Sequence, residues 1–117
     1  MKAESVLHSQ VMEKCLVIKT PEYVNKESGE NIVEEFNKHF DQGIKKLVID
    51  MVDSSVVNSI GISYLIEIIE KLNDVDGKMV FCNLDSSIEK TLKIMGLFNF
   101  AGTSETVETA VQKLGDN

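Results

Sequence analysis

The side chain best placed to do chemistry in this sequence is the hydroxyl of Ser59. It follows an apolar run at Leu47–Met51 and a polar break, and it directly precedes an apolar pattern with helical spacing. This order predicts a strand, a loop and a serine at the N-terminus of a helix. Gly61 leaves room there, and the free backbone N–H groups of a first helical turn would stabilise a phosphoryl group on the serine. Serine is also among the best N-cap residues, so a purely structural role is the alternative.

The residues that follow Ser59 predict a helix at Gly61–Leu72 with apolar side chains on two sides. One stripe has the spacing of a core-facing side. Its members are Ile62, Leu65, Ile66 and Ile69. Tyr64 and Ile68 fall on nearly the opposite side, one turn apart. These two residues either pack beneath a neighbouring element or form an apolar patch beside Ser59 that a partner protein covers.

The remaining reactive residue types lack the spacing of a catalytic or metal-binding set. His8 and His39 are far apart in the sequence, and Ser63 has neither the second glycine nor the histidine partner that a serine nucleophile would need. Asp74 and Asp76 precede a glycine, which is most simply a turn. We therefore predict no catalytic residue, no metal and no cofactor, and an interaction protein rather than an enzyme.

The charge of the chain argues against several kinds of partner. The 117 residues include 19 acidic side chains and 12 basic ones, all of them lysines, for a net charge of -7. Such a chain repels a phosphate backbone on average, so we expect no nucleic-acid partner. The lack of arginine also removes the usual bidentate clamp for a transferring phosphoryl group. In phosphate chemistry this protein would therefore be the acceptor rather than the catalyst.

The length and the hydrophobic content of 43% fit one globular domain. No apolar run approaches the roughly 18 residues of a membrane span, and the first ten residues do not form a secretory signal. Cys15 and Cys82 lie inside apolar runs, where buried free thiols are expected. We therefore expect a cytoplasmic protein with no membrane partner.

Strands alternate with helices along the chain, which predicts an α/β fold with a largely parallel or mixed sheet. The predicted strands are Val11–Lys19, as one strand or a short hairpin, Lys46–Met51 and Lys78–Asn83. The predicted helices run from Ser28 to Gly43, from Gly61 to Leu72, from Ser86 to Met95, and from Thr103 or Ser104 to Leu114. Ser86 and Glu89 would form a capping box at the start of the third helix. We assign residues 1–10 to an N-terminal segment and residues 11–117 to the domain.

Residues 58–61, which read Asn-Ser-Ile-Gly, resemble the phosphorylation loop of a known family. In the bacterial anti-sigma factor antagonists, the STAS-domain family, this loop usually reads Asp-Ser-Ser-Gly or Asp-Ser-Thr-Gly. Ser59 and Gly61 match that pattern, and Ser59 stands where the family is phosphorylated. The resemblance extends over roughly residues 11–114, because the segments 77–84 and 95–98 also look like their family counterparts in order and spacing.

This resemblance implies both a fold and a mode of action. The fold would be a STAS-like single domain with a small mixed sheet of about four strands, flanked by about four helices. A family member binds a serine kinase that is an anti-sigma factor, and this binding frees a sigma factor for transcription. The kinase modifies the loop serine, here Ser59, and a PP2C-type phosphatase restores it. The implied partner-binding residues are Asn58, Ser59, Ile60, Gly61, Tyr64 and Ile68, and no small-molecule substrate is expected.

Two positions depart from the family pattern. Asn58 replaces the acidic residue that usually precedes the serine, and the turn at Thr20–Asn25 has Val24 or Asn25 where the family has a second acid. Asparagine keeps the shape of aspartate but loses its charge, so we expect docking to survive better than phosphoryl transfer. The alternative function is a STAS module for interaction or ligand binding that no kinase regulates.

Overall fold

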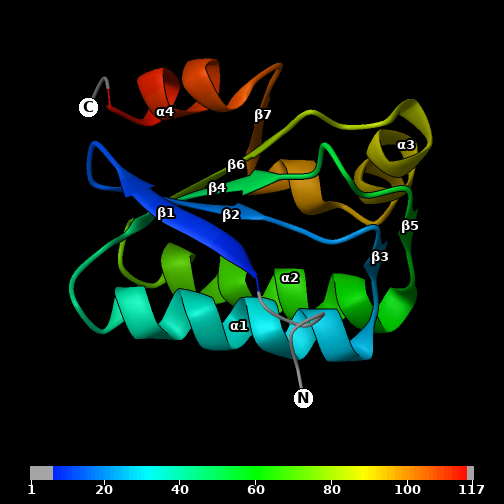
Figure 1. The fold of residues 1–117 in the computed structure, drawn as a ribbon, viewed down its shortest axis with the longest axis horizontal. Coiled ribbons are helices and arrows are strands. Elements are labelled where there is room, and N and C mark those ends of the chain that lie inside the picture. The colour runs from blue at the N-terminus through cyan, green and yellow to red at the C-terminus, as the bar shows by residue number, and fades with distance from the viewer. Residues whose placement is uncertain (1–6, 116–117) are drawn as a thin grey trace.

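A five-stranded mixed sheet forms the middle layer of the computed structural model, which describes residues 7–115 (Figure 1). The strands lie in the order β1-β2-β4-β6-β7. Their bounds are β1 (His8–Met12), β2 (Cys15–Lys19), β4 (Lys46–Asp50), β6 (Lys78–Cys82) and β7 (Gly102–Ser104). Only β1 is antiparallel to its neighbour, and the other pairs of this sheet are parallel. Each parallel pair therefore needs a crossover connection, which the helices provide.

The helices cover the two faces of the sheet unequally (Figure 1). α1 (Lys26–Phe40) and α2 (Ser59–Asn73) lie on one face, and α4 (Val107–Gly115) lies on the other. α3 (Ser86–Ile94) and the short 3-10 helix η2 (Leu97–Asn99) pack into the same core as α1 and α2. None of the helices described in residues 7–115 has the length and apolar character needed to cross a membrane.

Alternation along the strands divides the buried side chains into two clusters. Leu16 and Ile18 of β2 and Phe81 of β6 belong to the cluster beneath α1 and α2. Val17 of β2 and Val48 of β4 belong to the cluster beneath α4. The central strands are thus apolar on both faces, which is why they read as continuous hydrophobic runs in the sequence.

Two short strands form a second, two-stranded sheet at one end of the molecule. β3 (Tyr23–Val24) pairs in parallel with β5 (Val56–Val57) (Figure 1). β3 directly precedes α1, and β5 directly precedes α2. This pairing fixes the entry points of both helices next to one another.

The helix caps explain where the helices begin. Asn25 caps α1 and forms a reciprocal capping box with Ser28. Asp85 caps α3, and its side chain accepts a hydrogen bond from the Ser87 N–H at 2.6 Å. The predicted capping box of Ser86 and Glu89 is therefore wrong, because the aspartate one residue earlier takes the cap.

The structure confirms the α/β fold with a mixed sheet and four α-helices, and it shows more strands than the sequence predicted. Residues 11–19 form the end of β1, a turn and β2, because Glu13 and Lys14 both have positive φ and make a two-residue hairpin turn. β1 begins at His8, so the predicted domain boundary at residue 11 falls inside a strand. The short strands β3, β5 and β7 were not predicted, since two or three residues carry no readable alternation.

The predicted apolar patch of Tyr64 and Ile68 is not a surface of the folded protein. Ile68 is only 1% exposed and belongs to the main core, because α1 packs along α2 and covers this side of the helix. Tyr64 is half-buried against α1. Its hydroxyl lies 3.3 Å from a carboxylate oxygen of Glu30, and a methyl group on Gly29 would come within 2.5 Å of its ring.

We predict that Ile68→Ala lowers the free energy of unfolding by about 2–5 kcal/mol, the usual cost of a cavity at a fully buried aliphatic site. The matched control is Ile60→Ala on the same helix. Ile60 is 49% exposed, so its truncation should change stability by less than about 0.5 kcal/mol. Urea denaturation of both variants measures the difference, and equal stabilities would contradict the burial of Ile68.

Candidate functional site

The segment that carries Ser59 lies against the turn between β2 and β3. The backbone N–H groups of Ser55 and Val56 donate to the carbonyl of Glu22 at 2.9 and 3.1 Å, and the N–H of Asn58 donates to the carbonyl of Val24 at 3.1 Å. These bonds continue the β3–β5 pairing up to Asn58, the residue before α2 (Figure 1). The turn and the serine loop, which are more than thirty residues apart in sequence, thus form one surface.

Asn58 is the N-cap of α2. Its side-chain oxygen accepts the N–H of Gly61 at 2.8 Å, and its amide nitrogen lies 3.3 Å from the hydroxyl of Tyr23. Ser59 is the first residue of the helix, within the predicted range for the helix start. The N-cap role that the sequence left open for Ser59 is therefore performed by Asn58.

The hydroxyl of Ser59 is exposed, and no hydrogen bond within residues 7–115 engages it. The other serines of this segment are engaged. Ser54 is 4% exposed and donates to a backbone carbonyl at 2.6 Å, Ser55 donates to a carboxylate oxygen at 3.3 Å, and Ser63 donates to a carbonyl of its own helix at 2.6 Å. Ser59 therefore offers the free hydroxyl of the loop.

The start of α2 can hold a negative charge beside this hydroxyl. The cap takes the N–H of Gly61, and the N–H of Ile62 donates to the carbonyl of Asn58 at 3.0 Å. The N–H groups of Ser59 and Ile60 make no hydrogen bond with any part of the chain that the structure describes. The first turn of α2 also contains no acidic residue, so the positive end of the helix dipole is not neutralised there.

Gly61 is required because the helix backbone touches the neighbouring strand. A methyl group at this position would lie 2.7 Å from the carbonyl carbon of Val24 and would also meet its oxygen. Only glycine lets α2 begin this close to β3. Gly61 is itself buried, so its main role in this structure is to let α2 begin against β3.

Three partly exposed apolar side chains lie on the segments that meet at the start of α2, and we call them the loop patch: Tyr23, Val56 and Ile60. They are 46%, 47% and 49% exposed, respectively. Tyr23 and Val56 are directly paired between β3 and β5. The sequence analysis missed both, because strands of two residues show no alternation. In the sequence, the only indication of their role was an apolar residue in the segment after β2 and another in the segment after β4.

The two positions expected to correspond to the second acid of the family both have structural roles. Val24 is fully buried, and Asn25 caps α1. The acidic residue that the fold does bring to the loop is Glu22, whose carboxylate lies 3.3 Å from the hydroxyl of Ser55. The sequence alone did not indicate Glu22, because its contact with Ser55 depends on the pairing of β3 with β5.

Neither a metal centre nor a reactive thiol is present among residues 7–115. No group of three or more potential ligands among histidine, cysteine, aspartate and glutamate comes together there. Cys15 and Cys82 are buried and unpaired, as expected. Burial raises the pKa of both thiols, and the pKa of Cys82 reaches about 12, so both are protonated at neutral pH.

One family model and several known proteins match this chain. The model of the family described as STAS domain matches residues 7–110. BtrV of Bordetella bronchiseptica, named as a candidate anti-sigma factor antagonist, is 23% identical over 87 residues, which is 74% of this chain and 75% of BtrV. A serine-to-glutamate variant of RsbS from Moorella thermoacetica is similar in structure, with a TM-score of 0.82, 23% identity, and coverage of 96% of this chain and 97% of that one. Phosphorylated SpoIIAA of Bacillus has a TM-score of 0.73, 18% identity, and coverage of 92% and 98%.

We predict that Gly61→Ala lowers the free energy of unfolding by about 1–3 kcal/mol, because the methyl group must push α2 away from β3. Helix propensity alone would favour alanine by about 1 kcal/mol, so the sign of the change tests the contact. The control is Gly115→Ala at the end of α4, where the nearest atom to the added methyl group is 4.0 Å away. Thermal or urea unfolding measures both variants, and a stabilised Gly61→Ala would rule out the close approach.

Proposed function

The chain belongs to the STAS domain family, and we propose that it is an anti-sigma factor antagonist whose binding to its partner is switched off by phosphorylation of Ser59. The proposed partner is an anti-sigma factor serine kinase, and a PP2C-type phosphatase would restore the free serine. The protein would act in the cytoplasm, by binding rather than by catalysis. Transcription would be regulated indirectly, through the sigma factor that the kinase holds.

The observation that carries this proposal is the exposed hydroxyl of Ser59, which makes no bond within the described chain. A serine that capped the helix would lose a stabilising bond on modification. Because Asn58 performs that task, Ser59 can be phosphorylated without cost to α2. The kinase would reach it at the exposed start of the helix.

Phosphorylation would change the electrostatics of the loop while leaving the fold intact. A phosphoryl group adds about -1.5 to -2 charges, which the free N–H groups of Ser59 and Ile60 can accommodate. The same charge would lie at the edge of the loop patch, where a partner must bury Ile60 and its neighbours. Repulsion and desolvation would then weaken the complex, and removal of the phosphate would restore it.

The similar proteins support this assignment by their descriptions. BtrV is described as an anti-sigma factor antagonist, SpoIIAA was solved in a phosphorylated form, and RsbS was solved with glutamate in place of a serine. The second candidate function is a STAS module that no kinase regulates. It is favoured by one observation, the uncharged Asn58 at a position where the family usually has an acid.

We predict that the cognate kinase and ATP phosphorylate the wild-type protein at Ser59, and that Ser59→Ala abolishes this labelling. Peptide mapping by mass spectrometry identifies the site. The control variant is Ser63→Ala, one turn along the same helix, which should be labelled as the wild type is, because the Ser63 hydroxyl is held by a backbone carbonyl. Labelling that persists in Ser59→Ala would refute the assignment, and an unlabelled wild type would favour the unregulated module.

We predict that the partner docks on the loop patch, so that Ile60→Ala weakens binding by about 1–2 kcal/mol, typical of an interface anchor. Ser59→Asp should also weaken binding, because it supplies part of the phosphate charge at the edge of the patch. The matched control is Ile94→Ala on α3, where an isoleucine 76% exposed lies outside the patch. Calorimetric titration with the kinase compares the three variants. Loss of binding in Ile94→Ala with none in Ile60→Ala would place the interface elsewhere.

A further inference from the structure

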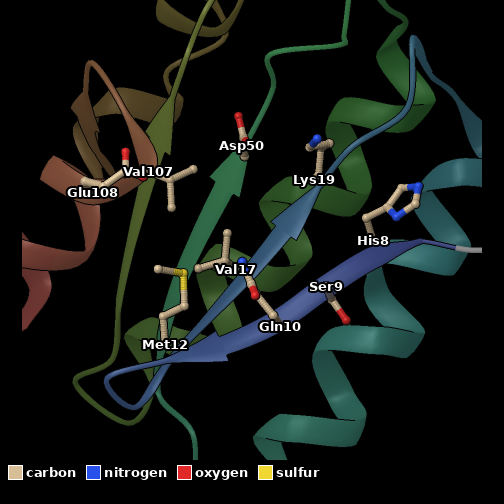
Figure 2. Close-up of a pocket in the computed structure, with 9 residues that line it drawn as sticks. All are labelled: His8, Ser9, Gln10, Met12, Val17, Lys19, Asp50, Val107 and Glu108. Atoms are coloured by element: carbon tan, nitrogen blue, oxygen red, sulfur yellow. The ribbon is translucent and has the colours of Figure 1, made fainter.

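A groove lies on the face of the sheet that α4 covers only in part, across the sheet from α1 and α2 (Figure 2). Its volume is about 460 Å³, within the range of about 300–1,000 Å³ that is common for small-molecule sites. β1 and β2 form its floor and one side, and the first residues of α4 form the opposite side. The lining residues that matter for its chemistry are Met12, Val17, Lys19, Asp50, Val107 and Glu108.

The strand register separates the floor of the groove into a charged row and an apolar row. His8, Lys19 and Asp50 are neighbours across β1, β2 and β4. This row lies at the carboxyl ends of the parallel strands, where open α/β sheets bind ligands. Two residues earlier on β2, Val17 begins an apolar row that continues to Val48 on β4. Figure 2 shows Val17 and Met12 below the charged row.

Asp50 lines this groove at the end of β4. The residue is only 6% exposed, and both of its side-chain hydrogen bonds, from the Val52 N–H at 3.2 Å and the Asn83 amide at 2.8 Å, reach Oδ1. No completely buried side-chain oxygen within residues 7–115 lacks a partner. The second oxygen, Oδ2, makes no hydrogen bond among these residues and therefore keeps contact with solvent, and Asp50 is one of the residues that line the groove. Burial is the main cause of the raised pKa of Cys82, and the carboxylates of Asp50 and Glu108 raise it further, so both carboxylates lie near this thiol.

The charges that line the groove are not paired with one another. Neither the ammonium group of Lys19 nor the carboxylate of Glu108 makes a hydrogen bond or ion pair in the described part of the chain. A simple anion would be attracted by Lys19 but repelled by the two carboxylates. A simple amine would be attracted by the two carboxylates but repelled by Lys19. A ligand that carries one negative and one positive group can pair with Lys19 and with the carboxylates at the same time.

We propose that this groove binds a free amino acid with an apolar side chain. Its ammonium group would lie between Asp50 and Glu108, and its carboxylate would pair with Lys19. The apolar side chain would rest on Val17 and Met12, against Val107 of α4. This is a binding site rather than a catalytic one, and it lies across the sheet from the helix that carries Ser59.

The test uses the full chain, labelled with ¹⁵N, and L-leucine as the probe. Two matched compounds each lack one charge: 3-methylbutylamine has no carboxylate, and 4-methylpentanoate has no ammonium group. We expect leucine to shift the amide signals of β2, the end of β4 and the start of α4, and to bind at least about tenfold more tightly than either matched compound. Failure of leucine to shift these signals at millimolar concentration, or equally tight binding of one matched compound, would overturn the proposal.

Two charge-removing variants and two controls test the assignment of the residues. Lys19→Gln and Glu108→Gln should each weaken leucine binding about tenfold or more, since each removes one ionic partner. Lys93→Gln on α3 and Glu67→Gln on α2 remove exposed charges elsewhere and should bind as the wild type does. Wild-type affinity in both groove variants, or equal losses in the controls, would show that the charged row does not form the site.

Discussion

The first turn of α2 rests on the backbone of β3, and the rest of the candidate site depends on this contact. The carbonyl of Val24 receives the N–H of Asn58 at 3.1 Å and leaves no space for a side chain at Gly61. This contact positions Asn58 to cap the helix, and the cap leaves the hydroxyl of Ser59 free. A larger residue at position 61 would separate helix and strand and would disturb the cap, the serine and the loop patch together.

The burial of α2 on two sides determines what kind of switch is possible. One side of the helix packs on the sheet and another packs on α1, so Leu65 and Ile68 are both enclosed in the core. Such a helix cannot rotate or shift without opening the core. The proposed signal at Ser59 is therefore best transmitted by charge at the surface, where Ile60 is already exposed, rather than by movement of the helix.

One stretch of chain connects the groove with the serine loop. β4 ends at Asp50, which lines the groove beside α4, and the chain then continues through β5 to Ser59. The segment between β4 and β5 is anchored to the chain after β2, because the buried hydroxyl groups of Ser54 and Thr20 lie 2.6 Å apart. The groove and the helix that carries Ser59 thus lie on opposite sides of the same sheet.

The sequence by itself determined the α/β class, the buried central strands, the helix that begins at Ser59 and the two residues, Ser59 and Gly61, that mark the loop. These features are local, since apolar periodicity and turn residues are written into consecutive positions. Tertiary structure decided which sides of α2 are exposed. The helical spacing placed Tyr64 and Ile68 away from the sheet, and only the packing of α1 shows that this side is covered. It also decided that Tyr23 and Val56 meet beside Ser59, because parallel pairing of two-residue strands joins distant segments that have no readable pattern of their own.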